Sequence, residues 1–487
     1  MAWRTGREIS KLSDAGSRPR FQGLTKTILT MRGSTTKAEL YSNGDQRITD
    51  NILQTSNGEL LYAGVTSKEL LRTLCNLHLV GYEPVVDASI KVLTSPLMQS
   101  ALFRVPVLQA VKYTAYSHFC AGENIAEAST TLKNMWKLGL RGIMDYGLED
   151  ATDSQSCDKN LTDFVNVVHQ SAVLPSGSVS FACVKITAIC PIQLLERVSN
   201  LLRWQHKNAK FKLPWRQEVM PVLANSSPTY HVKVAPEPLT REEENDLSLA
   251  HLRLWKLCEA CDQEGVPLLV DAEYSSVQPA IDYMVHAAAL DFNKGSQPLV
   301  YGTIQAYLKD AFPRLSLAAK DASKRGISYG VKLVRGAYLS REVELASSLH
   351  APSPIHKNIE ETHSCYDSCA AFMLEQAACG DGSVVLATHN MDSGRIAALK
   401  AEELGLSKED PRLQFAQLKG MADVLSLALT HAGFRVSKYL AFGPVYQVVP
   451  YLVRRAQENR GLLGNTALER QFIRRELRRR LQESAGL

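Results

Sequence analysis

Two adjacent arginines, Arg454 and Arg455, lie near the C-terminus, and Glu458 follows one helical turn after Arg454. The segment opens with apolar residues, which indicates that it packs on a core. A planar guanidinium holds a carboxylate through two parallel hydrogen bonds, and two neighbouring guanidinium groups repel each other unless an anion lies between them. The pair therefore predicts an anionic ligand, for which the carboxylate of a small amino or organic acid is suited. The alternative is a solvated arginine pair on a surface helix.

Eight short apolar runs follow one another along the chain after residue 136, and longer amphipathic stretches separate them. Runs that are apolar throughout predict strands buried on both faces, as parallel strands covered by helices are. Eight such strands predict an α/β fold, a (β/α)8 barrel of the TIM type, and an open doubly wound sheet is the alternative. The expected strands are residues 142–146, 179–186, 267–271, 299–304, 329–334, 383–388, 413–416 and 436–440.

Polar residues gather at the expected carboxyl ends of these strands, where a barrel holds its active site. A buried lysine or aspartate is costly unless it is paired, so several at one end of the barrel indicate a shared cavity. Its excess of positive charge favours an anionic ligand, alone or with a phosphate-bearing cofactor. The residues are Lys185, Asp271, Gln305, Lys332, Arg335, Thr388, His389, Gln417 and Tyr439, followed by Arg454 and Arg455 on a helix.

Composition and motifs limit the other classes of function. Of 487 residues, 45% are apolar and 22% charged, as in a soluble globular protein, and a net charge of +5 is too small to argue for nucleic acid. No apolar run is long enough for a spanning helix, and no secretory signal is expected. Ten scattered cysteines fit a reducing compartment. We find no clustered metal ligands, nucleophile elbow, Walker loop or G-x-G-x-x-G after a strand, so no metal site is expected.

The chain divides by pattern into four parts. Residues 1–40 are rich in basic residues, Ser and Thr, which predicts a mitochondrial transit peptide or a disordered basic arm. Residues 41–135 predict a helical region, and residues 136–465 the barrel, with an insertion at about 203–245. Residues 466–487 predict a basic amphipathic helix that packs on the barrel or binds an anionic membrane surface.

Three segments together resemble the signature segments of the proline dehydrogenase family, flavoenzymes also called proline oxidases. They are Val-Lys-Leu-Val-Arg-Gly-Ala-Tyr at 331–338, Leu-Ala-Thr-His-Asn at 386–390 and Tyr-Leu-Val-Arg-Arg-Ala-Gln-Glu-Asn at 451–459. The resemblance runs in order from Phe119 to the C-terminus. The insertion after Lys185, the sequence Asp-Ala-Glu at 271–273 and Ser-Lys-Tyr at 437–439 are most similar to the plant mitochondrial branch.

The resemblance implies a distorted barrel that holds FAD without a covalent bond and oxidises L-proline to Δ1-pyrroline-5-carboxylate by hydride transfer to flavin N5. It implies ubiquinone as the electron acceptor and a place on the matrix side of mitochondria, in peripheral contact with the inner membrane. Carried over by motif, the site and catalytic residues for proline are Lys185, Asp271, Tyr338, Tyr439, Tyr451, Arg454 and Arg455, with Glu458 paired to the arginines. The expected FAD contacts are Ala272, Gln305, Lys332, Arg335, Gly336, Ala337, Thr388, His389 and Gln417.

Two departures from the related sequences bear on this expectation. Bacterial relatives carry Arg-Leu-Val-Lys where this chain has Lys332-Leu-Val-Arg335, which keeps both charges but changes their geometry. The sister family that oxidises hydroxyproline typically has Ser at the position of Tyr439, whose ring would crowd a 4-hydroxyl, so proline is the expected substrate. The alternatives are a hydroxyproline dehydrogenase, a barrel without flavin that binds an anionic ligand, and a barrel that has lost catalysis.

Overall fold

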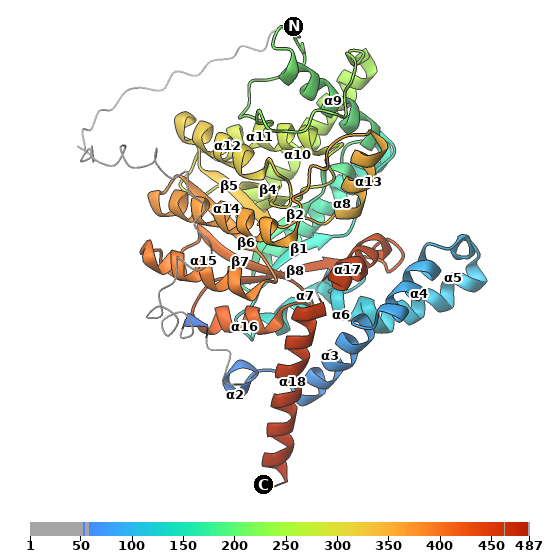
Figure 1. Ribbon diagram of the computed structural model, residues 1–487, viewed down its shortest axis with the longest axis vertical. Helices are drawn as coiled ribbons and strands as arrows, with labels where there is room; N and C mark the ends of the chain where they lie inside the picture. The colour runs from blue at the N-terminus through green and yellow to red at the C-terminus, as the bar shows by residue number, and fades with distance from the viewer. Residues whose placement is uncertain (1–51, 54–57, 462, 486–487) are drawn as a thin grey trace. The chain divides into compact units, whose positions relative to one another are not determined.

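Eight parallel strands pair in chain order and close into a barrel, because β1 pairs with β8 as well as with β2 (Figure 1). The computed structural model describes residues 52–53, 58–461 and 463–485, without the side chains of Val80 and 458–466. The predicted (β/α)8 barrel and its eight strands are confirmed. The strands are β1 (Arg141–Tyr146), β2 (Val179–Val184), β3 (Leu268–Val270), β4 (Val300–Gln305), β5 (Tyr329–Val334), β6 (Gly382–Ala387), β7 (Leu413–Leu418) and β8 (Val436–Phe442).

Helices cover the outside of the barrel, which explains why the strands are apolar throughout. In β8 all seven residues are buried. The helices that follow β1 are α8 (Ser154–Ala172), η3 (Ile186–Ala188), α9 (Ile192–Lys207), α10 (Arg241–Glu264), α11 (Gln278–Phe292), α12 (Ala311–Arg325), α13 (Leu339–Ser348), α14 (Ile359–Cys379), α15 (Met391–Glu403), α16 (Asp423–His431), α17 (Val449–Gly461) and α18 (Leu463–Ser484).

Local sequence fixes the ends of these helices. At the start of α10, Thr240 accepts a hydrogen bond from the backbone N–H of Glu243, whose side chain accepts one from the backbone N–H of Thr240. Gly265 ends the same helix with a φ of 65°, a left-handed conformation that a glycine adopts without steric cost. The chain then enters β3, which ends directly before Asp271.

The predicted insertion at about 203–245 has its first residues in α9 and its last in α10, and residues 208–240 between them hold no helix or strand. The sequence indicated a polar insertion, but the stretch also packs into the interior, because Met220 is fully buried. The Tyr283 hydroxyl on α11 accepts a hydrogen bond from the backbone N–H of Gln217 at 2.9 Å, and Ser227 donates to Asp310 at 2.6 Å. The segment is therefore attached to the outside of the barrel.

Helices also precede β1. They are α2 (Gly58–Leu61), α3 (Ser67–Val80), α4 (Glu83–Leu93), η1 (Pro96–Gln99), α5 (Ala101–Val111), η2 (Lys112–Tyr116), α6 (Ser117–Phe119) and α7 (Ile125–Trp136). The C-terminal helix α18 packs against α3. Of its expected apolar face, Ile473 is buried but Leu468 and Leu481 are exposed, because only part of the helix has neighbours to pack on. No helix among the described residues is long and apolar enough to cross a bilayer.

Candidate active site

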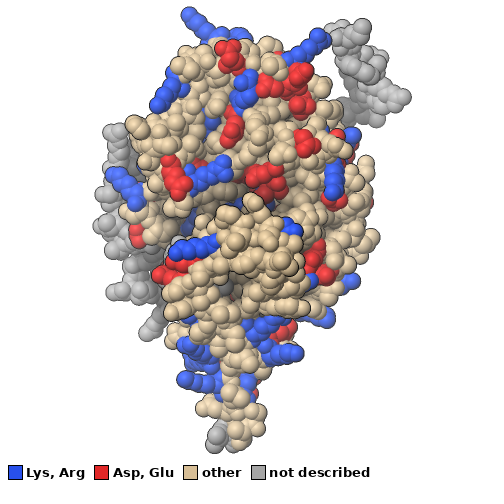
Figure 2. Space-filling view, turned by 90° about the vertical axis from the view of Figure 1, so that its right-hand side faces the viewer, with Lys and Arg blue, Asp and Glu red and all other residues tan. Residues whose placement is uncertain are grey.

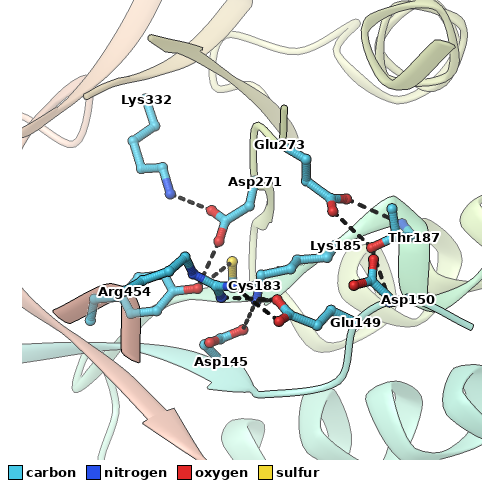
Figure 3. Close-up of polar contacts among 11 residues, drawn as sticks. Asp145, Glu149, Asp150, Cys183, Lys185, Thr187, Asp271, Glu273, Lys332 and Arg454 are labelled. Atoms are coloured by element: carbon cyan, nitrogen blue, oxygen red, sulfur yellow. Dashed lines mark hydrogen bonds and ion pairs between the residues drawn. The ribbon is translucent and has the colours of Figure 1, made fainter. Parts of the chain in front are cut away.

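Asp271, directly after β3, joins residues from two other strands at the carboxyl end of the barrel (Figure 3). Its carboxylate forms an ion pair with Lys332 of β5 and accepts a hydrogen bond from the Tyr439 hydroxyl of β8 at 2.7 Å. Burial alone would raise the pKa of Asp271, but the charges of Lys332 and Lys185 outweigh it and hold the pKa below its ordinary value. Asp271 is therefore an ionised carboxylate fixed by two partners.

A second cluster lies beside the first and centres on Glu149, which follows β1 (Figure 3). Arg454 of α17 donates to Glu149 through both terminal nitrogens, at 3.0 and 2.9 Å. The Lys185 ammonium lies 3.6 Å from Glu149 and 4.0 Å from Asp145. Burial would lower the pKa of Lys185, but these two carboxylates raise it above its ordinary value. Arg454 thus holds a carboxylate in a bidentate pair, but this carboxylate belongs to the protein, so the anionic ligand expected for the two arginines stays a prediction.

The two arginines have different surroundings. The guanidinium of Arg454 lies 5.7 Å from the centre of the Tyr338 ring, and that of Arg455 lies 5.0 Å from the Tyr451 ring. Arg455 is buried, with 6% of its surface exposed. The surface alternative is therefore wrong for this pair. The predicted partner Glu458 lies in α17, but its side chain is outside the described residues, so its pairing stays a prediction.

The predicted cofactor residues lie on the strands and loops from β3 to β7. Arg335, just after β5, donates to His363 at 2.8 Å, Thr388 at 2.7 Å and Ser393 at 2.8 Å. These hydrogen bonds connect the carboxyl end of β5 to the carboxyl end of β6 and to helices α14 and α15. The backbone N–H of Leu418 donates to Nε2 of His389, and burial lowers the pKa of His389 to about 3, so this histidine is neutral.

The remaining residues expected to contact the cofactor contribute a side-chain amide, that of Gln305, and backbone groups. Gln305 donates to the backbone carbonyl of Glu273 at 2.8 Å and accepts from the backbone N–H of Ala337 at 3.4 Å. Gly336 has a φ of 137°, and a Cβ atom there would lie 2.5 Å from the Tyr307 ring, so only glycine fits the turn. Ala272 follows Asp271 in the β3 loop.

Gln417 of β7 tests whether these residues fit a polar cofactor. Its side-chain oxygen accepts a hydrogen bond from Ser426 at 2.8 Å. Its side-chain nitrogen is buried and has no hydrogen-bond partner among the described residues. A buried donor without a partner is costly, and an acceptor atom of a bound ligand would satisfy it. Gln417, the cations Lys332 and Arg335 and the amide of Gln305 thus fit a ligand with polar and anionic groups.

A family model described as proline dehydrogenase matches residues 128–467, which is most of the chain. Proline dehydrogenase 1, mitochondrial, of Arabidopsis thaliana is 48% identical over 432 residues, which cover 88% of this chain and 87% of that protein. The chain belongs to the proline dehydrogenase family. The resemblance read from the sequence motifs, including its similarity to the plant branch, is confirmed.

Two further similarities bear on family and fold. The hydroxyproline dehydrogenase of Bos taurus is 33% identical over 434 residues, which cover 85% of this chain and 90% of that protein. A crystal structure of proline utilization A (PutA) from Bdellovibrio bacteriovorus has a TM-score of 0.61 at 20% identity. It covers 85% of this chain, which spans only 41% of the PutA chain, and at this identity it supports the barrel fold alone.

Three acidic residues of the candidate site were not singled out as site residues from the sequence: Asp145, Glu149 and Glu273. Asp145 lies in β1 and Glu149 three residues after its end, so the rule that strand ends carry the site could have identified both. Burial raises the pKa of Asp145 above its ordinary value. Tyr439 was expected at the end of β8 and instead lies in the middle of that strand, because β8 continues to Phe442.

Glu273 predicts a dependence of stability on pH. It is buried and accepts hydrogen bonds from the backbone N–H of Thr187 at 3.2 Å and its hydroxyl at 2.8 Å, and burial raises its pKa from 4.5 to about 7. A carboxyl group with a raised pKa in the folded state stabilises the fold below its unfolded pKa, and that contribution is lost as the pH rises through the folded value. We expect Glu273→Gln to flatten this fall in the free energy of unfolding between pH 4.5 and about 7.

Urea unfolding at a series of pH values measures this effect. Glu259→Gln on the exposed face of α10 is the control and should leave the profile as in the wild type. An unchanged slope in Glu273→Gln would show that Glu273 does not titrate in this interval.

Proposed function

We propose that this chain oxidises L-proline to Δ1-pyrroline-5-carboxylate with FAD as its cofactor. The observation that carries the proposal is the bidentate pair between Arg454 and Glu149, beside Lys185 at the carboxyl end of the barrel. It supports the proposal because Arg454 holds a carboxylate, that of Glu149, in the geometry that arginine prefers. Family membership supplies the substrate class, because the Arabidopsis thaliana relative is named a proline dehydrogenase.

In this proposal the substrate carboxylate binds to Lys185, Arg454 and Arg455, and its ring lies among Tyr338, Tyr439 and Tyr451. The buried cations orient the ring, since fixing a substrate in reactive geometry removes much of the entropic cost of the reaction. Asp271 keeps Tyr439 and Lys332 in place through its two contacts. Glu458 would support the arginines from the same helix.

FAD would be held by Lys332, Arg335, Thr388, His389 and Gln417, together with Ala272, Gln305, Gly336 and Ala337. When bound, it supplies the hydride acceptor, flavin N5. The residues of this chain bind and orient the substrate and exclude water. The buried donor of Gln417 and the two cations support this assignment.

Proline is favoured over hydroxyproline by Tyr439. This side chain is 8% exposed, and its hydroxyl is bound to Asp271. A 4-hydroxyl on the substrate would need the space that the tyrosine ring fills. Hydroxyproline is the second candidate, because hydroxyproline dehydrogenases are also similar to this chain.

The electron acceptor and the location extend the proposal. We propose ubiquinone as acceptor and the matrix side of mitochondria as location, in contact with the inner membrane. The Arabidopsis thaliana relative is named mitochondrial. The predicted transit peptide at residues 1–40 lies outside the described residues.

An absorption spectrum of the purified chain, recorded without oxygen before and after L-proline is added, tests cofactor and substrate together. We expect an oxidised flavin spectrum that bleaches with L-proline and much less with hydroxyproline. A flavin that stays oxidised with both would remove the substrate assignment. A protein that does not take up FAD on reconstitution would remove the cofactor and favour an anion-binding barrel.

A further inference from the structure

The helix α5 is apolar but has no buried residue. Eight of its eleven residues are Ala, Leu, Phe or Val, yet none of the eleven is buried in the described structure. The exposed fraction of the residue is 92% at Leu102, 57% at Val105 and 58% at Leu97 of the preceding η1. Isolated exposed apolar residues are common, but a contiguous patch of them marks a surface that binds something.

We call α4, η1 and α5, residues 83–111, the arm. In Figure 1 α4 and α5 extend away from the barrel. Figure 2, the view from the side toward which they extend, shows a projection with little acidic surface. The base of the arm is buried: Tyr116 is 3% exposed, and its hydroxyl donates to the backbone carbonyl of Gly443 at 2.8 Å. The arm thus adjoins a buried base, whereas Leu97, Leu102 and Val105 of the arm itself are exposed.

The arm has two acidic residues, Glu83 and Asp87, in the first turns of α4, and two basic residues, Lys91 and Arg104, farther along the chain. Residues 88–122 contain no Asp or Glu, although the chain has 50 acidic residues among 487. The same segment contains Lys91, Arg104 and Lys112. Lys91 and Arg104 are exposed, and Lys112 forms an ion pair with Glu123. Apolar side chains flanked by cations and free of acids are the composition of a segment that lies on an anionic bilayer.

The arm is attached beside the proposed active site. The backbone N–H of Ala121 donates to the carbonyl of Ala441 in β8 at 2.8 Å, and that of Gly443 donates to the carbonyl of Gly122 at 2.9 Å. Helix α4 also contacts α17, which carries Arg454 and Arg455. A surface that binds the arm therefore lies close to the carboxyl end of the barrel.

We propose that the arm docks on the surface of an anionic lipid bilayer, with Leu97, Leu102 and Val105 inserted below the headgroups. The exposed rings of Tyr82 and Tyr113 suit the headgroup level, because each has an apolar body and a polar tip. A second copy of this chain is a poorer occupant. A symmetric pairing of two arms through residues 88–111 would bring their cations face to face, because the acids Glu83 and Asp87 lie before that stretch.

The docking also deepens the proposed function, because it bears on how the electron acceptor reaches the enzyme. This consequence rests on the proposed function. An acceptor dissolved in a bilayer, as a quinone is, would then meet the enzyme on the side where the barrel opens. The docking itself rests on the surface of the arm, so the two can fail separately.

The test is sedimentation of the full chain with vesicles of phosphatidylcholine and phosphatidylglycerol, or of phosphatidylcholine alone. We expect Leu102→Ser combined with Val105→Ser to lower the apparent partition coefficient by about tenfold, since both side chains lose their inserted apolar surface. Lys91→Ser combined with Arg104→Ser should lower binding to the anionic vesicles by about tenfold and leave binding to neutral vesicles nearly unchanged. All four residues are exposed, so the variants should fold.

Leu481→Ser is the matched control, because Leu481 is 68% exposed on the basic helix α18. It should bind vesicles as the wild type does. Equal binding of the arm variants and the wild type would overturn the proposal, and loss with Leu481→Ser alone would assign the membrane contact to α18. A change from dimer to monomer in the arm variants, without a change in vesicle binding, would make the arm an interface between two copies. Activity with a water-soluble electron acceptor should be the same in all variants, which separates this test from that of the proposed reaction.

Discussion

Replacing Arg455 with Met should raise the KM for L-proline by at least about thirtyfold, because removing one member of a buried charge pair costs about 2 kcal/mol or more. Arg455 is 6% exposed and adjoins Arg454 on α17, so in the proposed complex its charge faces the substrate carboxylate with little screening by water. Met has a similar length but lacks the guanidinium that lies 5.0 Å from the Tyr451 ring. Steady-state kinetics with L-proline measures the effect.

The control for this change is Arg475→Met, at an exposed position of α18. It removes the same charge at a distance from the site and should leave KM unchanged. Arg455→Lys should fall between the two, because lysine keeps the charge but not the planar fork. A KM in Arg455→Met equal to that of the wild type would remove Arg455 from the carboxylate site.

Replacing Asp271 with Asn should lower kcat/KM by about a hundredfold or more, because it leaves the Lys332 ammonium without its carboxylate partner. Removing one partner of a buried ion pair lowers the free energy of unfolding by about 3–5 kcal/mol, because the other charge stays buried without compensation. The Tyr439 hydroxyl keeps an acceptor at the Asn oxygen but loses its bond to a charged group. The orientation of two side chains from two strands therefore changes at once. The rate of flavin reduction by L-proline in a single turnover measures this effect directly.

Asp291→Asn on α11 is the control, since Asp291 is exposed. It should match the wild type in both rate and thermal stability. Asp271→Glu keeps the charge but displaces it, so a rate between those of Asp271→Asn and the wild type is expected. A wild-type rate of flavin reduction in Asp271→Asn would mean that the carboxylate does not contribute to the chemical step.

The barrel could be predicted from the sequence because its strands are buried on both faces and therefore read as continuous apolar runs. Once the strands close in order, their carboxyl halves lie together around the barrel axis, and Asp271 meets Lys332 and Tyr439 there. Their convergence needed no knowledge of any loop. The doubly wound alternative is wrong, since β1 pairs with β8.

The partners of these residues could not be predicted in the same way. Glu149 meets Arg454 across 305 positions of sequence, and His363 reaches Arg335 from α14. Both contacts depend on how the loops after the strands fold, which periodicity does not report. The buried carboxyl of Glu273 is another example, because only the path of the β2 loop places Thr187 beside it.

The attachment of the arm has a consequence for the order of folding. The residues that hold it to the barrel, Ala441 and Gly443, are among the last fifty of the chain, whereas the arm is made before any strand. The same holds for β1, which lacks one of its two neighbours until β8 is complete. Contacts between residues so distant in sequence form slowly. Until they form, the apolar helix α5 is exposed in a partly folded chain, which favours aggregation. Nascent chains that stop before β8 should therefore be the forms that depend most on chaperones.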